Sequence, residues 1–244
     1  MRDNMIQAAI KYEGNYEKVA LAIKNNEKFS TGVRIHRVIT ILDKEYPATL
    51  KQLRYPPFVL FYKGNPELLN QSAISVIGSR QPESYGIEMT RKIVGNCNRK
   101  YVIVSGLAKG IDAIVHQEAL NTNRKTIGII GCGIDRIYPM ENENLYRQMS
   151  KFGCIVSEYP GYTPPRRHHF PFRNRLIAAL SEKCIVTAAT LKSGTMLTVN
   201  EALTLGKEVI CIPYPIGSAC GEGCNLLISQ GASILTNAAD FAMI

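Results

Sequence analysis

Seven short apolar runs, each bounded by Gly, Pro or Ser, constrain the fold of this chain most strongly. They fall at residues 73–77, 101–104, 126–130, 154–157, 184–188, 209–212 and 233–235. Between them lie stretches with helical spacing of apolar residues, at about 86–97, 112–121, 142–151, 173–181, 195–205 and 224–230. Apolar strands that alternate with helices are typical of a parallel sheet covered on both faces. The pattern predicts an α/β fold, a Rossmann-like, doubly wound domain with a mostly parallel sheet.

The first 70 residues depart from this pattern. Residues 1–45 are charged and rich in Asn and Lys, and the apolar residues Ile6, Ile10, Val19 and Ile23 predict two short amphipathic helices around Gly14. Residues 46–70 are punctuated by proline, and 58–62 could form one strand. We therefore predict a short N-terminal helical segment, 1–45, followed by a Rossmann-like domain with an N-terminal extension, 46–244.

The charge balance indicates the class of partner. The chain carries a formal net charge of +9, and nucleic acid is the commonest acidic partner of a soluble basic domain. Charge alone does not separate DNA from RNA, a nucleotide or a membrane surface.

The seven cysteines indicate the compartment. Most lie in or beside apolar runs, as expected of buried thiols in a reducing environment. Only Cys220 and Cys224 are close in sequence, and no second Cys/His pair has zinc-ligand spacing, so we expect no metal site. The sequence begins without a signal-peptide pattern and has no apolar run long enough to span a membrane. We expect a cytoplasmic protein.

The loops that follow the predicted strands are the candidate ligand site, because sheets of this class bind ligands beyond the carboxyl ends of their strands. These loops are rich in small residues, which allow the backbone to approach an anion. They carry the candidate binding residues Gly78, Ser79, Arg80, Lys109, Lys192 and Ser193. We expect a basic, glycine-lined groove. The alternative is a set of glycine-rich loops that bind nothing.

Residues 165–182 concentrate positive charge and aromatic rings. No acidic residue lies between Glu158 and Glu182. Pro171 and the apolar residues after it predict a helix that begins near Phe172 or Arg173, where free backbone N–H groups favour an anion. Single-stranded nucleic acid needs cations for its phosphates and flat faces for its bases. The segment offers both, although it could also be a solvated basic loop; its members are Arg166, Arg167, His168, His169, Phe170, Phe172, Arg173, Asn174 and Arg175.

Familiar catalytic patterns are missing from the sequence. It has no phosphate loop of the ATPase type, no hydrolase nucleophile elbow and no His-Glu-x-x-His. The acidic candidates Asp112, Asp135, Glu158 and Glu201 form no recognisable pair. We expect Asp112 to cap the helix that starts after Ile111.

Several motifs occur together and in order along the chain. They are Gly78-Ser79-Arg80 with Tyr85-Gly86, Ser105-Gly106-Leu107-Ala108-x-Gly110-Ile111-Asp112, Gly133-Ile134-Asp135-x-Ile137-Tyr138-Pro139, Phe170-Pro171-x-Arg173-Asn174-Arg175 and Gly223-Cys224-Asn225. By these motifs the chain resembles the DNA processing protein A (DprA/Smf) family from about residue 46 to 235. The resemblance implies a non-catalytic protein that binds single-stranded DNA, protects incoming strands in natural transformation and helps to load the RecA recombinase. It also implies a homodimer.

The resemblance assigns roles to matching residues. It implies that Arg80, Phe170, Arg173, Asn174 and Arg175 bind DNA. Ile228 and Ile234 would belong to the dimer face. With the loop and segment residues above, the full set of expected DNA contacts is Gly78, Ser79, Arg80, Lys109, Arg166, His169, Phe170, Arg173, Asn174, Arg175, Lys192 and Ser193.

The sequence also departs from the family pattern. Met140 stands after Tyr138-Pro139, where a basic residue can occur, and Val199 stands where a small residue is usual. The N-terminal helical segment looks abbreviated, and we expect no winged-helix extension.

Two other function classes remain as alternatives. One is a nucleoside monophosphate hydrolase of the lysine-decarboxylase-like Rossmann group, but Gly194-Thr195 lacks the preceding Pro-Gly-Gly of that group and Glu201 comes too late. The other is a purely structural interaction domain, which the charge on the ligand-binding loops disfavours.

Overall fold

A computed structural model of the chain describes residues 1–29 and 37–244. Its described strands form one nine-stranded sheet in the order β1-β2-β6-β5-β4-β3-β7-β8-β9. The strands are β1 (Val38–Thr40), β2 (Val59–Gly64), β3 (Ala73–Gly78), β4 (Val102–Ser105), β5 (Thr126–Ile129), β6 (Cys154–Ser157), β7 (Lys183–Ala188), β8 (Glu208–Cys211) and β9 (Ser233–Ile234).

The sheet is parallel from β6 to β9, and β2 joins it antiparallel to β6. β1 adds an antiparallel edge strand beside β2. The chain moves outward from β3 through β4 and β5 to β6, then returns to place β7 on the other side of β3. The switch point of the doubly wound sheet therefore lies between β3 and β7. The predicted fold class is confirmed.

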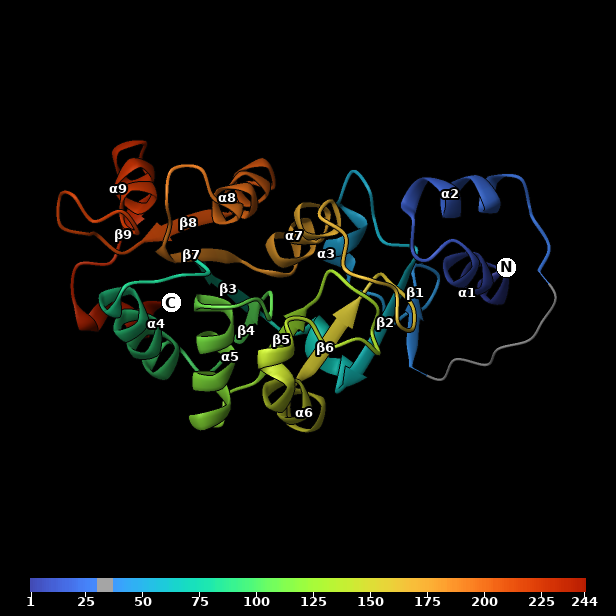
Figure 1. The fold of residues 1–244 in the computed structure, drawn as a ribbon, viewed down its shortest axis with the longest axis horizontal. Coiled ribbons are helices and arrows are strands. Elements are labelled where there is room, and N and C mark those ends of the chain that lie inside the picture. Colours follow the sequence, from blue (N-terminus) through green and yellow to red (C-terminus); the bar gives the residue numbers. More distant parts are fainter. Residues whose placement is uncertain (30–36) are drawn as a thin grey trace.

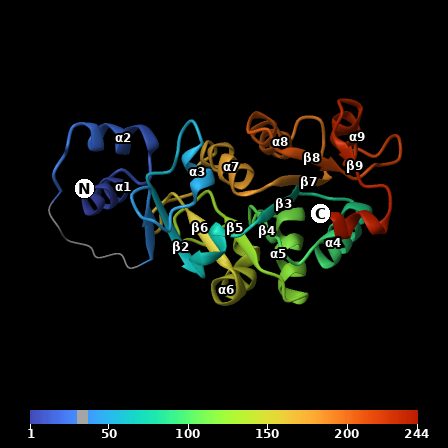
Figure 2. The ribbon, with the colours of Figure 1, turned by 180° about the vertical axis from the view of Figure 1, so that it is seen from behind.

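Helices cover both faces of the sheet (Figures 1 and 2). One face carries α4 (Ser84–Asn96), α5 (Ile111–Asn121) and α6 (Glu143–Phe152), and the other carries α7 (His169–Leu180), α8 (Gly194–Thr204) and α9 (Glu222–Ser229). The short helix α3 (Ala48–Lys51) packs against α7, and three 3-10 turns, η1 (Pro66–Asn70), η2 (Met140–Asn142) and η3 (Ala238–Met243), lie in connections or at the C-terminal end. Among the described residues, no helix is both long and apolar enough to cross a membrane.

The central strands have no solvent-exposed face. Ile74 and Val76 of β3 and their neighbours Ile185 and Val186 of β7 are all fully buried. A strand covered by helices on both faces has no solvent-facing positions, so its residues do not alternate between apolar and polar. The continuous apolar sequences of β3 and β7 are therefore a consequence of their central position.

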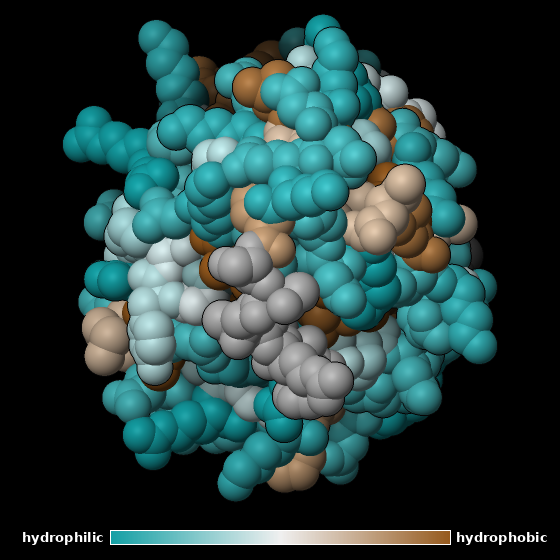
Figure 3. All heavy atoms as spheres, turned by 90° about the vertical axis from the view of Figure 1, so that its right-hand side faces the viewer, coloured by the Kyte–Doolittle hydropathy of each residue, from teal (hydrophilic) through white to brown (hydrophobic). Residues whose placement is uncertain are grey.

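The N-terminal residues form α1 (Arg2–Lys11) and α2 (Tyr16–Lys24), which confirms the two helices predicted around Gly14. Gly14 takes a positive φ of 71° in the turn between them, and the Asn15 side chain accepts a hydrogen bond from the Lys18 N–H and so caps α2. Ile6 and other buried apolar residues of both helices share a cluster with Phe61 of β2. This end of the molecule presents mostly hydrophilic side chains with hydrophobic ones between them (Figure 3). The domain boundary at residue 45 stays a prediction.

Candidate nucleic-acid interface

A cleft of about 790 Å³ opens at the switch point of the sheet. The loops after β3, β4 and β7 and the first turns of α7 and α8 line it, so its position is the one expected for ligands in this class of sheet. Most of the predicted DNA contacts line this cleft, namely Gly78, Ser79, Arg80, Lys109, Phe170, Arg173, Asn174 and Ser193. Residues that the sequence reasoning did not single out as contacts also line it, among them Tyr138, Arg167, Thr195 and Thr198.

Arg80 and Phe170 place a cation and an aromatic ring side by side in the cleft. The Arg80 guanidinium carbon lies 5.6 Å from the centre of the Phe170 ring. The exposed Arg80 is free to reach solvent, whereas Phe170 is half-buried and packs against Tyr138, with 5.6 Å between ring centres. A cation and an aromatic ring are the two kinds of group that single-stranded nucleic acid requires.

The Gly78-Ser79-Arg80 loop is fixed by neighbouring backbone. The Ser79 N–H donates to the Ala188 carbonyl at 2.8 Å, and the Ser79 carbonyl accepts from the Ile111 N–H at 3.0 Å. Gly110, which has a positive φ of 72°, lies so close to Ser79 and Arg80 that a Cβ would collide with their backbone. The loop that carries Arg80 is therefore held between β7 and the start of α5.

Arg173 and Asp112 form the buried base of the cleft. The Arg173 guanidinium donates to the carbonyls of Gly106, at 2.7 Å, and Ile129. Burial raises the pKa of Asp112 while the positive charge of Arg173 opposes that rise, and burial lowers the pKa of Arg173. A Cβ at Gly106 would overlap both side chains. A side chain at position 106 would therefore require the Asp112 and Arg173 side chains to shift.

The expectation that Asp112 caps its helix is wrong. α5 begins at Ile111 with Gly110 at the cap position, and no side chain caps it. Asp112 lies inside the first turn of α5, where it is buried close to the positive charge of Arg173.

The predicted start of α7 is also wrong. The helix begins at His169, not near Phe172 or Arg173. Pro171 is tolerated because it lies in the first turn, where a backbone N–H has no partner within the helix. Arg173, Asn174 and Arg175 consequently belong to the second turn, and the free N–H groups of this helix end precede them.

Arg175 is held inside the protein. Its guanidinium donates to both carboxylate oxygens of Glu158 at 2.6 Å and to the Tyr55 carbonyl at 3.0 Å. Both side chains of the ion pair are at least nine-tenths buried. The face of the guanidinium lies 3.7 Å from the centre of the Phe172 ring. A DNA contact by Arg175 stays an untested prediction, and this geometry gives the residue a structural role.

Three other predicted contacts lie outside the cleft. His169 is buried, stacks on Tyr159 with 3.9 Å between ring centres, and has its Nδ1 3.2 Å from the Gly131 carbonyl oxygen. Arg166 pairs with Glu13 of the N-terminal helical turn at 2.5 Å. Lys192 is exposed beside the start of α8.

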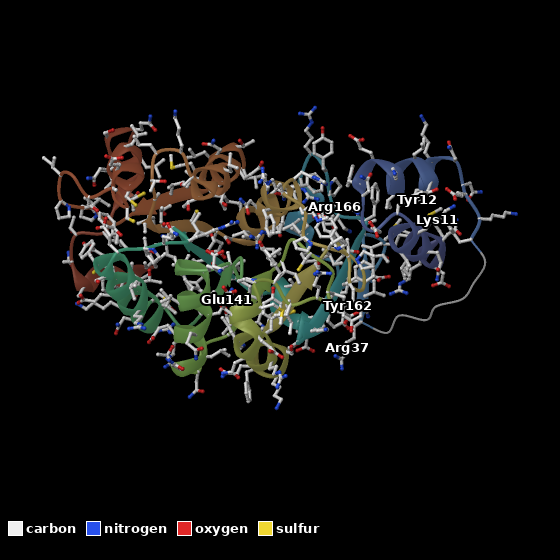
Figure 4. The ribbon with its side chains drawn as sticks, in the orientation of Figure 1. Lys11, Tyr12, Arg37, Glu141, Tyr162 and Arg166 are labelled. Carbon is white, nitrogen blue, oxygen red and sulfur yellow. The ribbon has the colours of Figure 1, made fainter. Side chains whose placement is uncertain are left out.

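Two acidic residues pair with predicted DNA contacts from separate parts of the surface. Glu13 holds Arg166, next to the N-terminal helices, and Glu141 pairs with Lys109 at the cleft. The labelled side chains show that Arg166 and Glu141 lie apart (Figure 4). Each pair is partly exposed, so solvent and salt weaken it.

A second cavity, of about 820 Å³, lies between α1, β2 and residues 160–164. Its charged lining is mixed, since Glu13 and Asp135 face it together with Arg37 and Lys63. Lys63 and Asp135 already pair at 2.9 Å. Arg37 and Tyr162 lie together at this end of the molecule (Figure 4). The mixed charge makes this cavity a poorer match for a polyanion than the switch-point cleft.

Within residues 1–29 and 37–244, no three His, Cys, Asp or Glu side chains come together as a potential metal site. Glu201, the carboxylate considered for nucleotide hydrolysis, lies on α8 and is not among the residues that line the cleft.

Comparison with known proteins identifies the family. Residues 37–243 match the model of the DNA recombination-mediator protein A family. The chain belongs to this family. It is 39% identical to DNA processing protein DprA of Streptococcus pneumoniae over 201 residues, which cover 82% of this chain and 71% of the relative. It is 40% identical to the DprA protein of Bacillus subtilis over 204 residues, 83% of this chain and 69% of the relative.

Solved DprA structures agree with the fold. The S. pneumoniae protein superposes with a TM-score of 0.81 at 33% identity, covering 98% of this chain and 91% of that structure. The Helicobacter pylori protein superposes with a TM-score of 0.76 at 31% identity, covering 84% of this chain and 94% of that structure, which is described in terms of a unique single-stranded DNA binding mode. The resemblance drawn from the motifs is thus confirmed at the level of family and fold.

Proposed function

We propose that this member of the DprA family binds single-stranded DNA in the switch-point cleft. The observation that carries the proposal is the pairing of Arg80 with Phe170, because it offers a phosphate and a base their respective partners within 5.6 Å. The exposed Arg167 and the cleft residue Lys109 add positive charge beside this pair. The single-stranded DNA binding mode described for the H. pylori relative supports the proposal.

We divide the predicted contacts into two groups by exposure. Gly78, Ser79, Arg80, Lys109, Phe170 and Ser193 would meet the strand directly, and Arg166 and Lys192 would extend the basic surface beyond the cleft. The buried group would shape the walls that hold the first group, and it consists of His169, Arg173, Asn174 and Arg175.

The physiological role in the proposal is that of a recombination mediator without catalysis. It would protect incoming strands in natural transformation and assist RecA loading. The description of the family as DNA recombination mediators supports the general role. All seven cysteines are free and buried, a pattern common in reducing compartments such as the cytoplasm. A pull-down of RecA on immobilised single-stranded DNA would test the partner. We expect more RecA to be retained when this protein is present than when it is left out.

We also propose that two copies associate through the end of the sheet at β9. Ile234 on this edge strand is 42% exposed and Leu226 on α9 is 38% exposed, while Ile228 is partly buried against the core. Exposed apolar side chains beside an unpaired strand edge suit an isologous contact. Light scattering of the wild type and an Ile234→Asp variant should give a dimer and a monomer, respectively, and identical masses would argue against this face.

The direct test of strand binding is fluorescence anisotropy with an oligothymidine strand and a matched duplex across a salt series. We expect a strong preference for the single strand and an affinity that falls with salt, because phosphate contacts release counterions. Equal affinity for both, or binding to neither, would contradict the proposal. In the second case, release of base from nucleoside monophosphates would be measured next.

A further inference from the structure

The wall of the cleft formed by the start of α8 carries hydroxyl side chains, whereas the loop after β3 carries the Arg80 guanidinium. Three hydroxyl residues of this wall, Ser193, Thr195 and Thr198, line the cleft. Thr195 and Thr198 are 8% and 4% exposed, and they are three positions apart on one face of the helix. Among the described residues, neither threonine hydroxyl has a hydrogen-bond partner, and the buried Ser193 Oγ has none either.

Several buried threonine hydroxyls elsewhere in the described part of the chain are paired, although the Thr40 Oγ1 is buried without a partner. The Thr90 hydroxyl donates to the Gly86 carbonyl at 2.7 Å, and the Thr126 hydroxyl donates to the Ile103 carbonyl at 2.9 Å. Burial of a hydroxyl without a partner is unfavourable, so buried polar groups are normally paired. On the α8 wall the Ser193 Oγ is buried without a partner, and the unpaired Thr195 and Thr198 hydroxyls are accessible from the cleft, where a ligand can supply partners.

The backbone at the same place points to an anion. α8 is eleven residues long, its N-cap Ser193 makes no side-chain capping bond, and its first N–H groups are free by the geometry of a helix end. A Cβ at Gly194 would meet no atom within 4 Å, so open space lies before the helix. Asn174 donates to the Gly194 carbonyl at 3.4 Å and ties this end of α8 to α7.

The number of donors favours a particular kind of phosphate. Ser193, Thr195 and Thr198 line one wall of the cleft together with the first turn of α8, whose N–H groups have no partner within the helix. A phosphodiester within a strand offers two free oxygens and one charge, whereas a phosphomonoester offers three oxygens and close to two charges at neutral pH. The richer donor set matches the monoester.

We infer that the α8 wall is a binding site for the phosphomonoester of a nucleotide. The cleft volume of about 790 Å³ is within the range that holds a ligand of nucleotide size. The monoester could belong to a free nucleoside monophosphate or to the 5′-phosphate end of a strand. The inference refines the proposed function at one wall of the same cleft, but it does not need strand binding to be correct.

Calorimetric titration of the full chain with deoxythymidine 5′-monophosphate and with thymidine tests the site. We expect the monophosphate to bind and thymidine not to bind. Thr195→Val and Thr198→Val keep the side-chain shape and remove one hydroxyl each, so each should weaken monophosphate binding about tenfold, the loss typical of a hydrogen bond to a charged group. Thr204→Val is the matched control, because Thr204 is on the same helix, is exposed and bonds to the Asn200 carbonyl at 2.8 Å. It should bind like the wild type.

The two sources of the monoester are separated with oligothymidine that carries either a 5′-phosphate or a 5′-hydroxyl. Tighter binding of the phosphorylated strand, lost in Thr195→Val, would assign the site to strand ends. Binding of the free monophosphate alone would assign it to a nucleotide. Equal binding of both strands, together with no preference for the monophosphate over thymidine in the wild type, would overturn the inference. Since the 5′-hydroxyl strand also reports on strand binding, either idea can fail while the other stands.

Discussion

Arg175 and Glu158 form a two-bond ion pair, with both N–O distances at 2.6 Å, beneath the surface of the proposed DNA-binding face. They are 17 positions apart in sequence, and the pair joins the loop after β6 to α7. The arginine thereby anchors the helix whose first turn carries Phe170 to the loop at the carboxyl end of β6.

Removing Arg175 should destabilise the protein. Arg175→Ala leaves the buried Glu158 carboxylate without its partner, and such losses typically cost about 3–5 kcal/mol of unfolding free energy. Urea unfolding followed by circular dichroism would measure the change. Arg147→Ala is the control, because Arg147 pairs with Glu143 on the exposed surface of α6 and its loss should cost less than about 1 kcal/mol. Equal stability of both variants would remove the anchoring role from Arg175.

Phe170→Ala should weaken single-strand binding by about 1–3 kcal/mol, the usual contribution of one base stack. The salt dependence of binding should stay unchanged, because no phosphate contact is lost. Anisotropy at several salt concentrations separates the two effects. Phe152→Ala is a suitable control, since Phe152 is 71% exposed at the end of α6. Unaltered affinity in Phe170→Ala would exclude stacking on this ring.

Glu13→Gln should modestly strengthen strand binding. The substitution releases Arg166 from its ion pair, and because the pair is exposed the gain should be at most about 1 kcal/mol. The gain should disappear at high salt, where the pair is screened. Glu17→Gln, on the exposed side of α2, removes the same charge without touching Arg166. If both variants gained equally, net charge and not Arg166 would be responsible.

Stability should fall as the pH is lowered from about 6.5 to about 4. Burial lowers the pKa of His169 to about 4 and that of His116 to about 3, whereas unfolded histidine titrates near 6.5. Between these values the unfolded chain binds more protons than the folded one, so its population grows as the pH falls. Urea unfolding at pH 7, 6, 5 and 4 would measure this slope.

A variant identifies the histidine responsible. His169→Asn should reduce the slope of unfolding free energy against pH, and the same substitution at the exposed His168 should leave it as in the wild type. An identical slope in all three proteins would show that protonation of His169 does not destabilise the fold.

The strands and helices of the core were predicted well from the sequence, because a strand that is buried on both faces consists almost entirely of apolar residues. The run 154–157 matches β6, and the helix predicted over 195–205 is α8 displaced by one residue. β1 was not predicted, because a strand of three residues has too few positions to show a pattern, and its pairing with β2 depends on distant sequence.

The candidate site was predicted only in part. Arg80 and Phe170 lie together as the sequence motifs suggested. The environment of Arg175 depends on Glu158, and a pairing over 17 positions across a loop leaves no periodic signal. Thr195 and Thr198 follow Gly194 and are three positions apart, which places them on one face of a helix. This spacing is visible in the sequence, but it is equally typical of ordinary helix packing.

The salt dependence of single-strand binding in Arg80→Ala tests the central claim most directly. Arg80 is exposed, so its loss should leave the fold intact, while one missing phosphate contact should reduce the slope of log affinity against log salt by about 0.7. The exposed Arg147→Ala should keep the wild-type slope. If Arg80→Ala also kept the wild-type slope and affinity, the strand would not occupy the switch-point cleft.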